Sequence, residues 1–137
     1  MIELLVVISI IGILTVLFLP NLVGTRQRAR DSRRKQDLAE IKNALRIYYN
    51  DNQAYPDAMT FGATWTDSGT TYMQHVPDDP LQGQEYYYCT DATNNGFVLA
   101  AKLENAADPE IDESTSRCDS VCSIGDCDST CYYVCAN

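Results

Sequence analysis

A run of sixteen uncharged residues, Leu4 to Leu19, constrains the fold more than any other feature. As an α-helix it would be about 24 Å long, slightly shorter than a bilayer core of about 30 Å. It is apolar on every side, and a globular part of this size has no room to enclose it. We therefore expect lipid or identical helices to cover it. A cleaved secretory signal is disfavoured, because acidic Glu3 precedes the run and Leu19-Pro20 is not a cleavage site.

Charge is divided sharply along the chain, whose formal net charge is -9. Residues 1–50 carry eight Lys/Arg and four Asp/Glu, a net of +4, whereas residues 51–137 carry two and fifteen, a net of -13. An acidic part of this kind repels phosphate backbones, so we expect no nucleic-acid partner.

A second helix is predicted over residues 21–52, continuing the apolar segment 1–20 into the globular part. Gly12 and Pro20 weaken the helix between them, which predicts either a kink or local unwinding. Apolar residues recur at three- and four-residue steps in the second helix and so share one face. They are Leu38, Ile41, Leu45 and Tyr48.

Residues 53–137 are expected to form a globular head with little helix. The runs 85–90 and 96–103 predict an antiparallel hairpin spanning about 84–104. Residues 58–76 are predicted to be a packed loop with one short helix, 104–116 an acidic connector, and 131–135 a final strand. The fold class is therefore α+β, with a long N-terminal helix packed on a small antiparallel sheet.

All six cysteines lie beyond residue 88, five of them in the tail 105–137. An even number in a small polar domain favours disulfides and an oxidising compartment. Zinc is the alternative, but the tail spacings of three, four, three and three residues do not match the Cys-x-x-Cys motif. Fifteen connectivities remain open. The cysteines are Cys89, Cys118, Cys122, Cys127, Cys131 and Cys135.

Three stretches of the chain carry a family resemblance. The N-terminal one reads Ile2-Glu3-Leu4-Leu5-Val6-Val7-Ile8, then Gly12-Ile13-Leu14 and Leu19-Pro20-Asn21-Leu22. The others are 44–56, which ends in Tyr55-Pro56, and 76–99, which includes Val76-Pro77-Asp78-Asp79-Pro80. Over residues 2–104 the chain resembles type IV pilins and the pseudopilins of type II secretion, whereas the cysteine-rich tail resembles neither.

The resemblance implies a type IV pilin fold and a subunit that polymerises with copies of itself. It implies a single pass through the cytoplasmic membrane before assembly, and then a place in an extracellular surface filament. Partners would be a pilus assembly machinery and a prepilin peptidase. Members usually begin Phe-Thr-Leu-Ile-Glu after a basic leader is removed, whereas this sequence begins Met1-Ile2-Glu3. Either the leader and two residues precede this sequence or processing differs.

Glu3 is the expected docking residue, because the resemblance pairs this carboxylate with the N-terminal amine of a neighbouring subunit. The alternative is a first-turn acid favoured by the helix dipole. Gly12 and Pro20 are the expected sites of melting. The filament core would be formed by Leu4, Leu5, Val6, Val7, Ile8, Ile10, Ile11, Ile13, Leu14, Val16, Leu17, Phe18 and Leu19.

The basic stretch 26–35 has two interpretations. It is either a solvated neck, or a surface that meets the acidic heads of neighbouring subunits and makes the filament sensitive to salt. Its basic residues are Arg26, Arg28, Arg30, Arg33, Arg34 and Lys35.

No catalytic motif is present, so we expect neither an enzyme nor a cofactor. Calcium on the acidic tail residues is an alternative to simple solubility, although no EF-hand spacing occurs. We predict the major structural subunit of a type IV pilus-like filament. The alternatives are a type II secretion pseudopilin or minor pilin, and a membrane-anchored, cysteine-rich binding module. The tail acids are Glu110, Asp112, Glu113, Asp119, Asp126 and Asp128.

Overall fold

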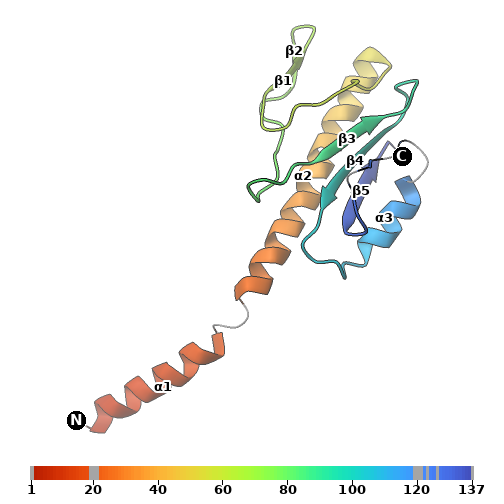
Figure 1. The fold of residues 1–137 in the computed structure, drawn as a ribbon. Coiled ribbons are helices and arrows are strands. Elements are labelled where there is room, and N and C mark those ends of the chain that lie inside the picture. Colours follow the sequence, from red (N-terminus) through yellow and green to blue (C-terminus); the bar gives the residue numbers. More distant parts are fainter. Residues whose placement is uncertain (1, 19–21, 119–121, 123, 126, 137) are drawn as a thin grey trace.

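The computed structural model describes residues 2–18, 22–118, 122, 124–125 and 127–136. Helix α1 (Ile2–Phe18) projects from a head built on helix α2 (Leu22–Asn52), as Figure 1 shows. The fold is α+β, as predicted, and its strands form a two-stranded and a three-stranded antiparallel sheet. The remaining elements are β1 (Trp65–Asp67), β2 (Thr70–Met73), β3 (Tyr87–Thr90), β4 (Phe97–Lys102), α3 (Glu110–Cys118) and β5 (Cys131–Cys135).

The main core lies between α2 and the sheet β3-β4-β5. The middle strand, β4, is buried from Phe97 to Ala101, as expected for a continuous apolar run. Successive strand side chains point to opposite faces. Phe97 and Leu99 therefore pack against the apolar face of α2, while Val98 packs on the other side against the Cys118–Cys135 disulfide. Of the predicted α2 face, Leu38, Ile41 and Leu45 are fully buried.

The predicted hairpin is confirmed with slightly shorter strands, and the final strand is confirmed with the predicted limits, Cys131–Cys135. Strands β3 and β4 pair antiparallel, with Thr90 opposite Phe97 across the turn. Strand β5 pairs antiparallel with the other edge of β4. The exposed side of β5 is covered in part by α3, because the Ser114 hydroxyl accepts the N–H of Tyr133 at 3.1 Å.

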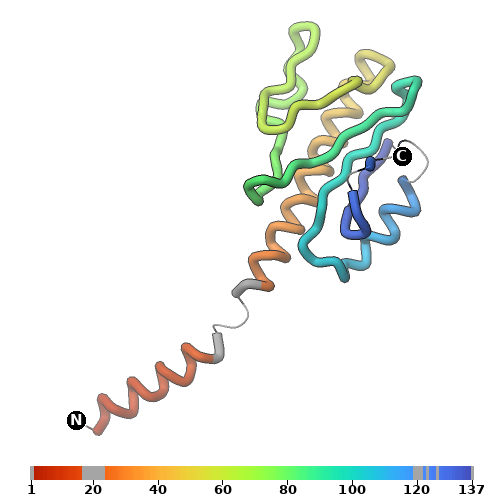
Figure 2. Tube along the Cα trace, viewed as in Figure 1, coloured from red at the N-terminus to blue at the C-terminus, as the bar shows by residue number. Residues whose placement is uncertain are grey.

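Residues 58–76 contain a hairpin, so the short helix predicted there is wrong. Strands β1 and β2 are joined by Ser68 and Gly69, both with positive φ (49° and 84°). Two such residues match the twist of a two-residue hairpin turn. Figure 2 shows this hairpin at the end of the molecule farthest from α1.

The predicted acidic connector contains helix α3. Asp108 caps its start, since one carboxylate oxygen accepts the N–H of Glu110 at 3.0 Å. Pro109 at the first position and acids in the first turn favour helix, and Arg117 lies in the last turn. The acidic residues of this connector therefore help to start a helix.

All six cysteines form disulfides, so the disulfide prediction is confirmed. One disulfide ties β3 to the segment after α3, a second joins the ends of α3 and β5, and the third closes a short loop before β5. The pairs are Cys89–Cys122, Cys118–Cys135 and Cys127–Cys131.

Candidate assembly interface

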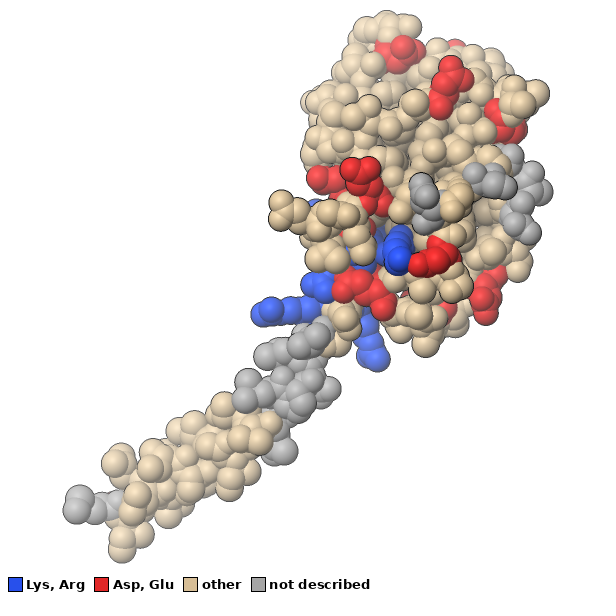
Figure 3. Space-filling model, in the orientation of Figure 1, with Lys and Arg blue, Asp and Glu red and all other residues tan. Residues whose placement is uncertain are grey.

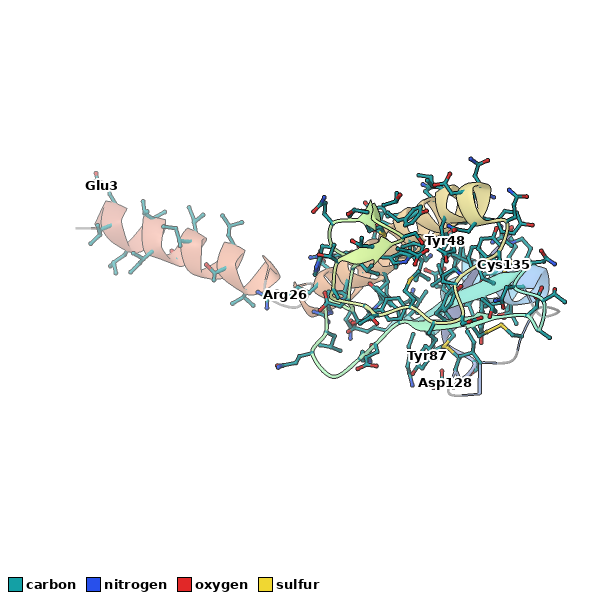
Figure 4. The ribbon with its side chains drawn as sticks, turned by 90° about the horizontal axis from the view of Figure 1, so that it is seen from above. Glu3, Arg26, Tyr48, Tyr87, Asp128 and Cys135 are labelled. Atoms are coloured by element: carbon teal, nitrogen blue, oxygen red, sulfur yellow. A yellow bond between two sulfur atoms is a disulfide. The ribbon has the colours of Figure 1, made fainter. Side chains whose placement is uncertain are left out.

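Helix α1 exposes apolar side chains on every side (Figure 4). The large apolar residues from Ile2 to Val16 are 49% to 78% exposed. Soluble monomers rarely expose apolar patches above a few hundred Å², so this surface requires a cover. Within the described residues, no helix is long and apolar enough to cross a membrane. The exposed residues are Ile2, Leu4, Leu5, Val6, Val7, Ile8, Ile10, Ile11, Ile13, Leu14 and Val16.

The two hydroxyl side chains of α1 are compatible with an apolar cover. The Ser9 hydroxyl donates to the carbonyl of Leu5 or Val6, both at 2.8 Å, and the Thr15 hydroxyl donates to the carbonyl of Ile11 at 2.7 Å. Each hydroxyl is therefore satisfied by its own helix. Ser9 and Thr15 therefore need no hydrogen bond from water, and Glu3 is the remaining polar side chain of α1.

Glu3 lies in the first turn at the far end of α1 and is exposed (Figure 4). Gly12 lies within the continuous helix, and a Cβ added there would meet nothing within 4 Å. Its predicted melting is therefore absent in the single subunit, and melting on assembly stays a prediction. Pro20 and Leu19 lie outside the described residues.

The basic residues of 26–35 divide into two groups. Arg26 and Arg28 are exposed, as is 67% of the Arg33 side chain. Figure 3 shows basic side chains projecting at the base of the head, beside α1. We name Arg26, Arg28 and Arg33 the arginine collar. The other three, Arg30, Arg34 and Lys35, bind acids of the head.

Arg34 is fully buried, so the prediction of a solvated neck is wrong at this position. Its guanidinium binds both carboxylate oxygens of Asp79, at 2.7 and 2.9 Å. It also donates to Asp31 at 2.7 Å, to Glu104 at 3.0 Å and to Gln84 at 3.1 Å. All the N–H groups of a guanidinium can be used in such an arrangement, which ties α2 to two loops of the head.

The charges of this cluster reinforce one another. Burial alone would lower the pKa of Arg34, but hydrogen bonds to Asp79 and Asp31 outweigh it and raise that pKa. Hydrogen bonds from Arg30, at 2.5 and 2.6 Å, lower the pKa of Glu104 to about 2. Arg34 and Glu104 are therefore both charged near neutral pH.

The acids that bind Arg34 are not predicted by local sequence patterns. Asp79 and Glu104 lie 45 and 70 residues away along the chain, so no helical spacing relates them to Arg34. The Pro-Asp-Asp-Pro turn was the available signal for Asp79, because an acid in a rigid turn is held in one place.

Calcium finds no support within the described residues. Among them, no group of three or more acidic, histidine or cysteine side chains is placed to hold a metal ion. Glu110 instead pairs with Lys35 at 3.1 Å, and Asp128 pairs with Lys102 at 2.6 Å. Asp119 and Asp126 lie outside the described part.

Comparison with known proteins places the chain among secretion proteins. Residues 21–108 match the family described as Type II secretion system (T2SS), protein G. The Type II secretion system core protein G of Escherichia coli K12 is 33% identical over 112 residues, covering 72% of this chain and 75% of that protein. The Vibrio cholerae protein of that name is 31% identical over 116 residues, covering 74% and 77%.

The Aeromonas hydrophila core protein G is 34% identical over 93 residues, which cover 58% of this chain. The match spans 64% of that protein, slightly less than two thirds of its length. No solved structure matches the chain significantly.

The family match covers well over half of the chain and includes α2, the Arg34 cluster and the β3–β4 hairpin. It confirms the resemblance to pilins and pseudopilins. It favours the secretion alternative over the major pilin of an extracellular pilus. The chain belongs to the type II secretion system protein G family, within the pilin and pseudopilin group.

Proposed function

We propose that this chain is a pseudopilin, a structural subunit that polymerises through α1 into the filament of a type II secretion system. The observation that carries the proposal is an exposed helix, apolar on every side, attached to a head of the protein G family. Burial of apolar surface contributes about 25 cal/mol per Å². Copies of α1 packed together would provide that burial.

Glu3 gives this assembly its register. An unpaired carboxylate inside an apolar bundle costs several kcal/mol. The N-terminal amine of a neighbouring subunit, the partner that the family resemblance implies, would compensate it only at one axial offset. Buried pairs of this kind fix geometry more than they stabilise.

The relatives' names indicate where the protein works. They are called core proteins of a type II secretion system. We infer a place in the cell envelope, with α1 associated with the cytoplasmic membrane before assembly. Other components of the secretion system and a prepilin peptidase are the expected partners.

The major pilin of a surface pilus is the second candidate, because three disulfides in the head and tail suit a surface outside the cell. Deleting the gene separates the two functions. A pseudopilin should be required for export of secreted enzymes, whereas a pilin should be required for fibres in the sheared extracellular fraction. A monomeric binding module would show neither defect and would purify without filaments.

Glu3→Gln tests the docking role. We expect unchanged protein level and membrane association, with loss of filaments under the electron microscope. The reason is that a neutral amide cannot compensate the positive charge of the protonated N-terminal amine. Glu40→Gln, an exposed acid of α2, removes the same charge and should assemble normally. Wild-type filament yield from Glu3→Gln would refute the role.

A further inference from the structure

The end of the head farthest from α1 is held together by three aromatic rings. Tyr48 of α2 lies 5.1 Å from Trp65 of β1 and 5.0 Å from Tyr72 of β2, between ring centroids. The third pair, Trp65 and Tyr72, is 5.2 Å apart. These contacts fix the β1–β2 hairpin on the last turns of α2.

Three carboxylates lie at this end of the head, two of them beside these rings. Asp51 accepts a hydrogen bond from the Tyr72 hydroxyl at 3.2 Å, and Asp57 accepts one from the Asn94 amide at 2.6 Å. Burial raises the pKa of the Tyr48 hydroxyl, and the nearby negative charge of Asp67 raises it further. We name Asp51, Asp57 and Asp67 the distal acidic patch.

The ion pairs of five basic residues use acids outside this patch; the residues are Arg30, Arg33, Arg34, Lys35 and Lys102. Asp51 and Asp57 are exposed. Three clustered negative charges repel one another, so an approaching cationic surface would be favoured.

The arginine collar lies at the opposite end of the same helix. From Arg26 to Asp51 the chain runs along α2, and 25 residues at 1.5 Å each make about 38 Å. Charges so far apart are screened from each other, because the Debye length is about 8 Å at physiological salt. One subunit therefore presents a positive base and a negative tip that cannot neutralise each other.

We propose that the arginine collar of one copy binds the distal acidic patch of the next copy, head to tail along the filament. This rests on the proposed function. A contact between two different surfaces of identical chains propagates without closing, which is the symmetry of a filament. Each side carries three side chains of one sign, of which Arg33 also lies 3.8 Å from Asp37 of its own helix. The contact sets an axial offset of about 38 Å. Ionic contacts of this kind select register and partner.

Crosslinking tests the contact directly. Arg28→Lys keeps the charge and adds an amine that a carbodiimide joins to a touching carboxylate. In filaments of this full-length variant, mass spectrometry should find position 28 joined to Asp51, Asp57 or Asp67, and the link should fall at high salt. Within one chain, Asp51 lies 23 residues beyond position 28 on α2, about 35 Å away, and Asp57 and Asp67 follow the far end of that helix. The link must therefore join two copies. Filaments that form without this link, or with position 28 joined only to acids outside the distal acidic patch, overturn the proposal.

Charge reversal tests the energetics. Arg26→Glu with Arg28→Glu should lower filament yield about tenfold, since attraction becomes repulsion. Adding Asp51→Arg and Asp57→Arg should restore assembly. Arg117→Glu, an exposed arginine of α3, is the matched control and should have little effect.

The outcomes separate the possible partners. If the wild type forms no filament, the proposed function fails; if filaments form but the compensating reversal does not restore them, only the head-to-tail contact fails. The collar could alternatively meet anionic lipid headgroups. Loss of binding to phosphatidylglycerol vesicles in Arg26→Glu/Arg28→Glu, with no rescue of assembly, would assign the collar to lipid and overturn the proposal.

Discussion

Replacing Arg34 by methionine should destabilise the head more than any other single change at the base of α2. Methionine is of similar length but carries no charge or N–H donor. Removing the guanidinium takes both hydrogen bonds, at 2.7 and 2.9 Å, from Asp79, whose side chain is 1% exposed. Asp79 then keeps only the N–H of Leu81, at 2.8 Å, among its donors in the described structure.

The magnitude follows from which acids lose their partners. Asp31 is less affected, because the backbone N–H groups of Glu104 and Asn105 still bind it, both at 2.9 Å. The main cost is the uncompensated carboxylate of Asp79, and breaking a buried pair in this way costs about 3–5 kcal/mol. That is a large share of a typical unfolding free energy of about 5–15 kcal/mol.

Denaturant unfolding of the full chain in mild detergent, followed by Trp65 fluorescence, measures this loss. Arg33→Met is the control: its side chain is 67% exposed and lies 3.8 Å from Asp37, so we expect a change below about 1 kcal/mol. The double variant Arg34→Met/Asp79→Leu should recover much of the stability, because it removes the carboxylate that Arg34→Met alone leaves buried and unpaired. A loss of stability below about 1 kcal/mol in Arg34→Met would show that the Asp79 carboxylate does not depend on this arginine.

Two further predictions concern the head. The pKa of Glu104 in the folded chain, about 2, lies below its ordinary value of 4.5. Its contribution to the stability of the fold is therefore present above pH 4.5 and is lost as the pH falls toward 2. Glu104→Gln should flatten the acid unfolding curve in that pH range, and an unchanged curve would contradict this. Removing the Cys118–Cys135 disulfide, of sequence separation 17, should cost about 3 kcal/mol, against about 2 kcal/mol for Cys127–Cys131, of separation 4. Paired serine variants measured by thermal unfolding test that order, which equal losses would contradict.

Local sequence patterns predict the elements that are defined by one apolar helix face or one apolar run. The spacing of Leu38, Ile41 and Leu45 predicts the buried face of α2, because a helix repeats every 3.6 residues. The run 96–103 predicts one strand of a hairpin, and β4 forms there, buried from Phe97 to Ala101. The even number of cysteines predicts disulfides, but their pairing depends on the folded chain.

The β1–β2 hairpin and helix α3 were not predicted, although each has a local sequence signal. Ser68-Gly69 is a turn signal, and Asp108-Pro109-Glu110 is a helix start. The Arg34 cluster is a different case. Its partners come together only when α2 packs on the loops after β2 and β4, so tertiary structure decides whether an arginine in a charge run faces water or the core.

The helical period explains how one basic run can serve two purposes. Arg30 and Arg34 are four residues apart, so they share a face of α2, and that face binds Asp79 and Glu104 of the head. Arg26 continues the same face one turn toward α1, but it is exposed, because the head does not extend that far. The face of α2 that binds the head thus continues beyond the edge of the head, where Arg26 is exposed and able to bind another molecule. A neighbouring subunit approaching along the filament axis would meet this edge first, which is why the collar, and not the buried arginines, should determine the salt sensitivity of assembly.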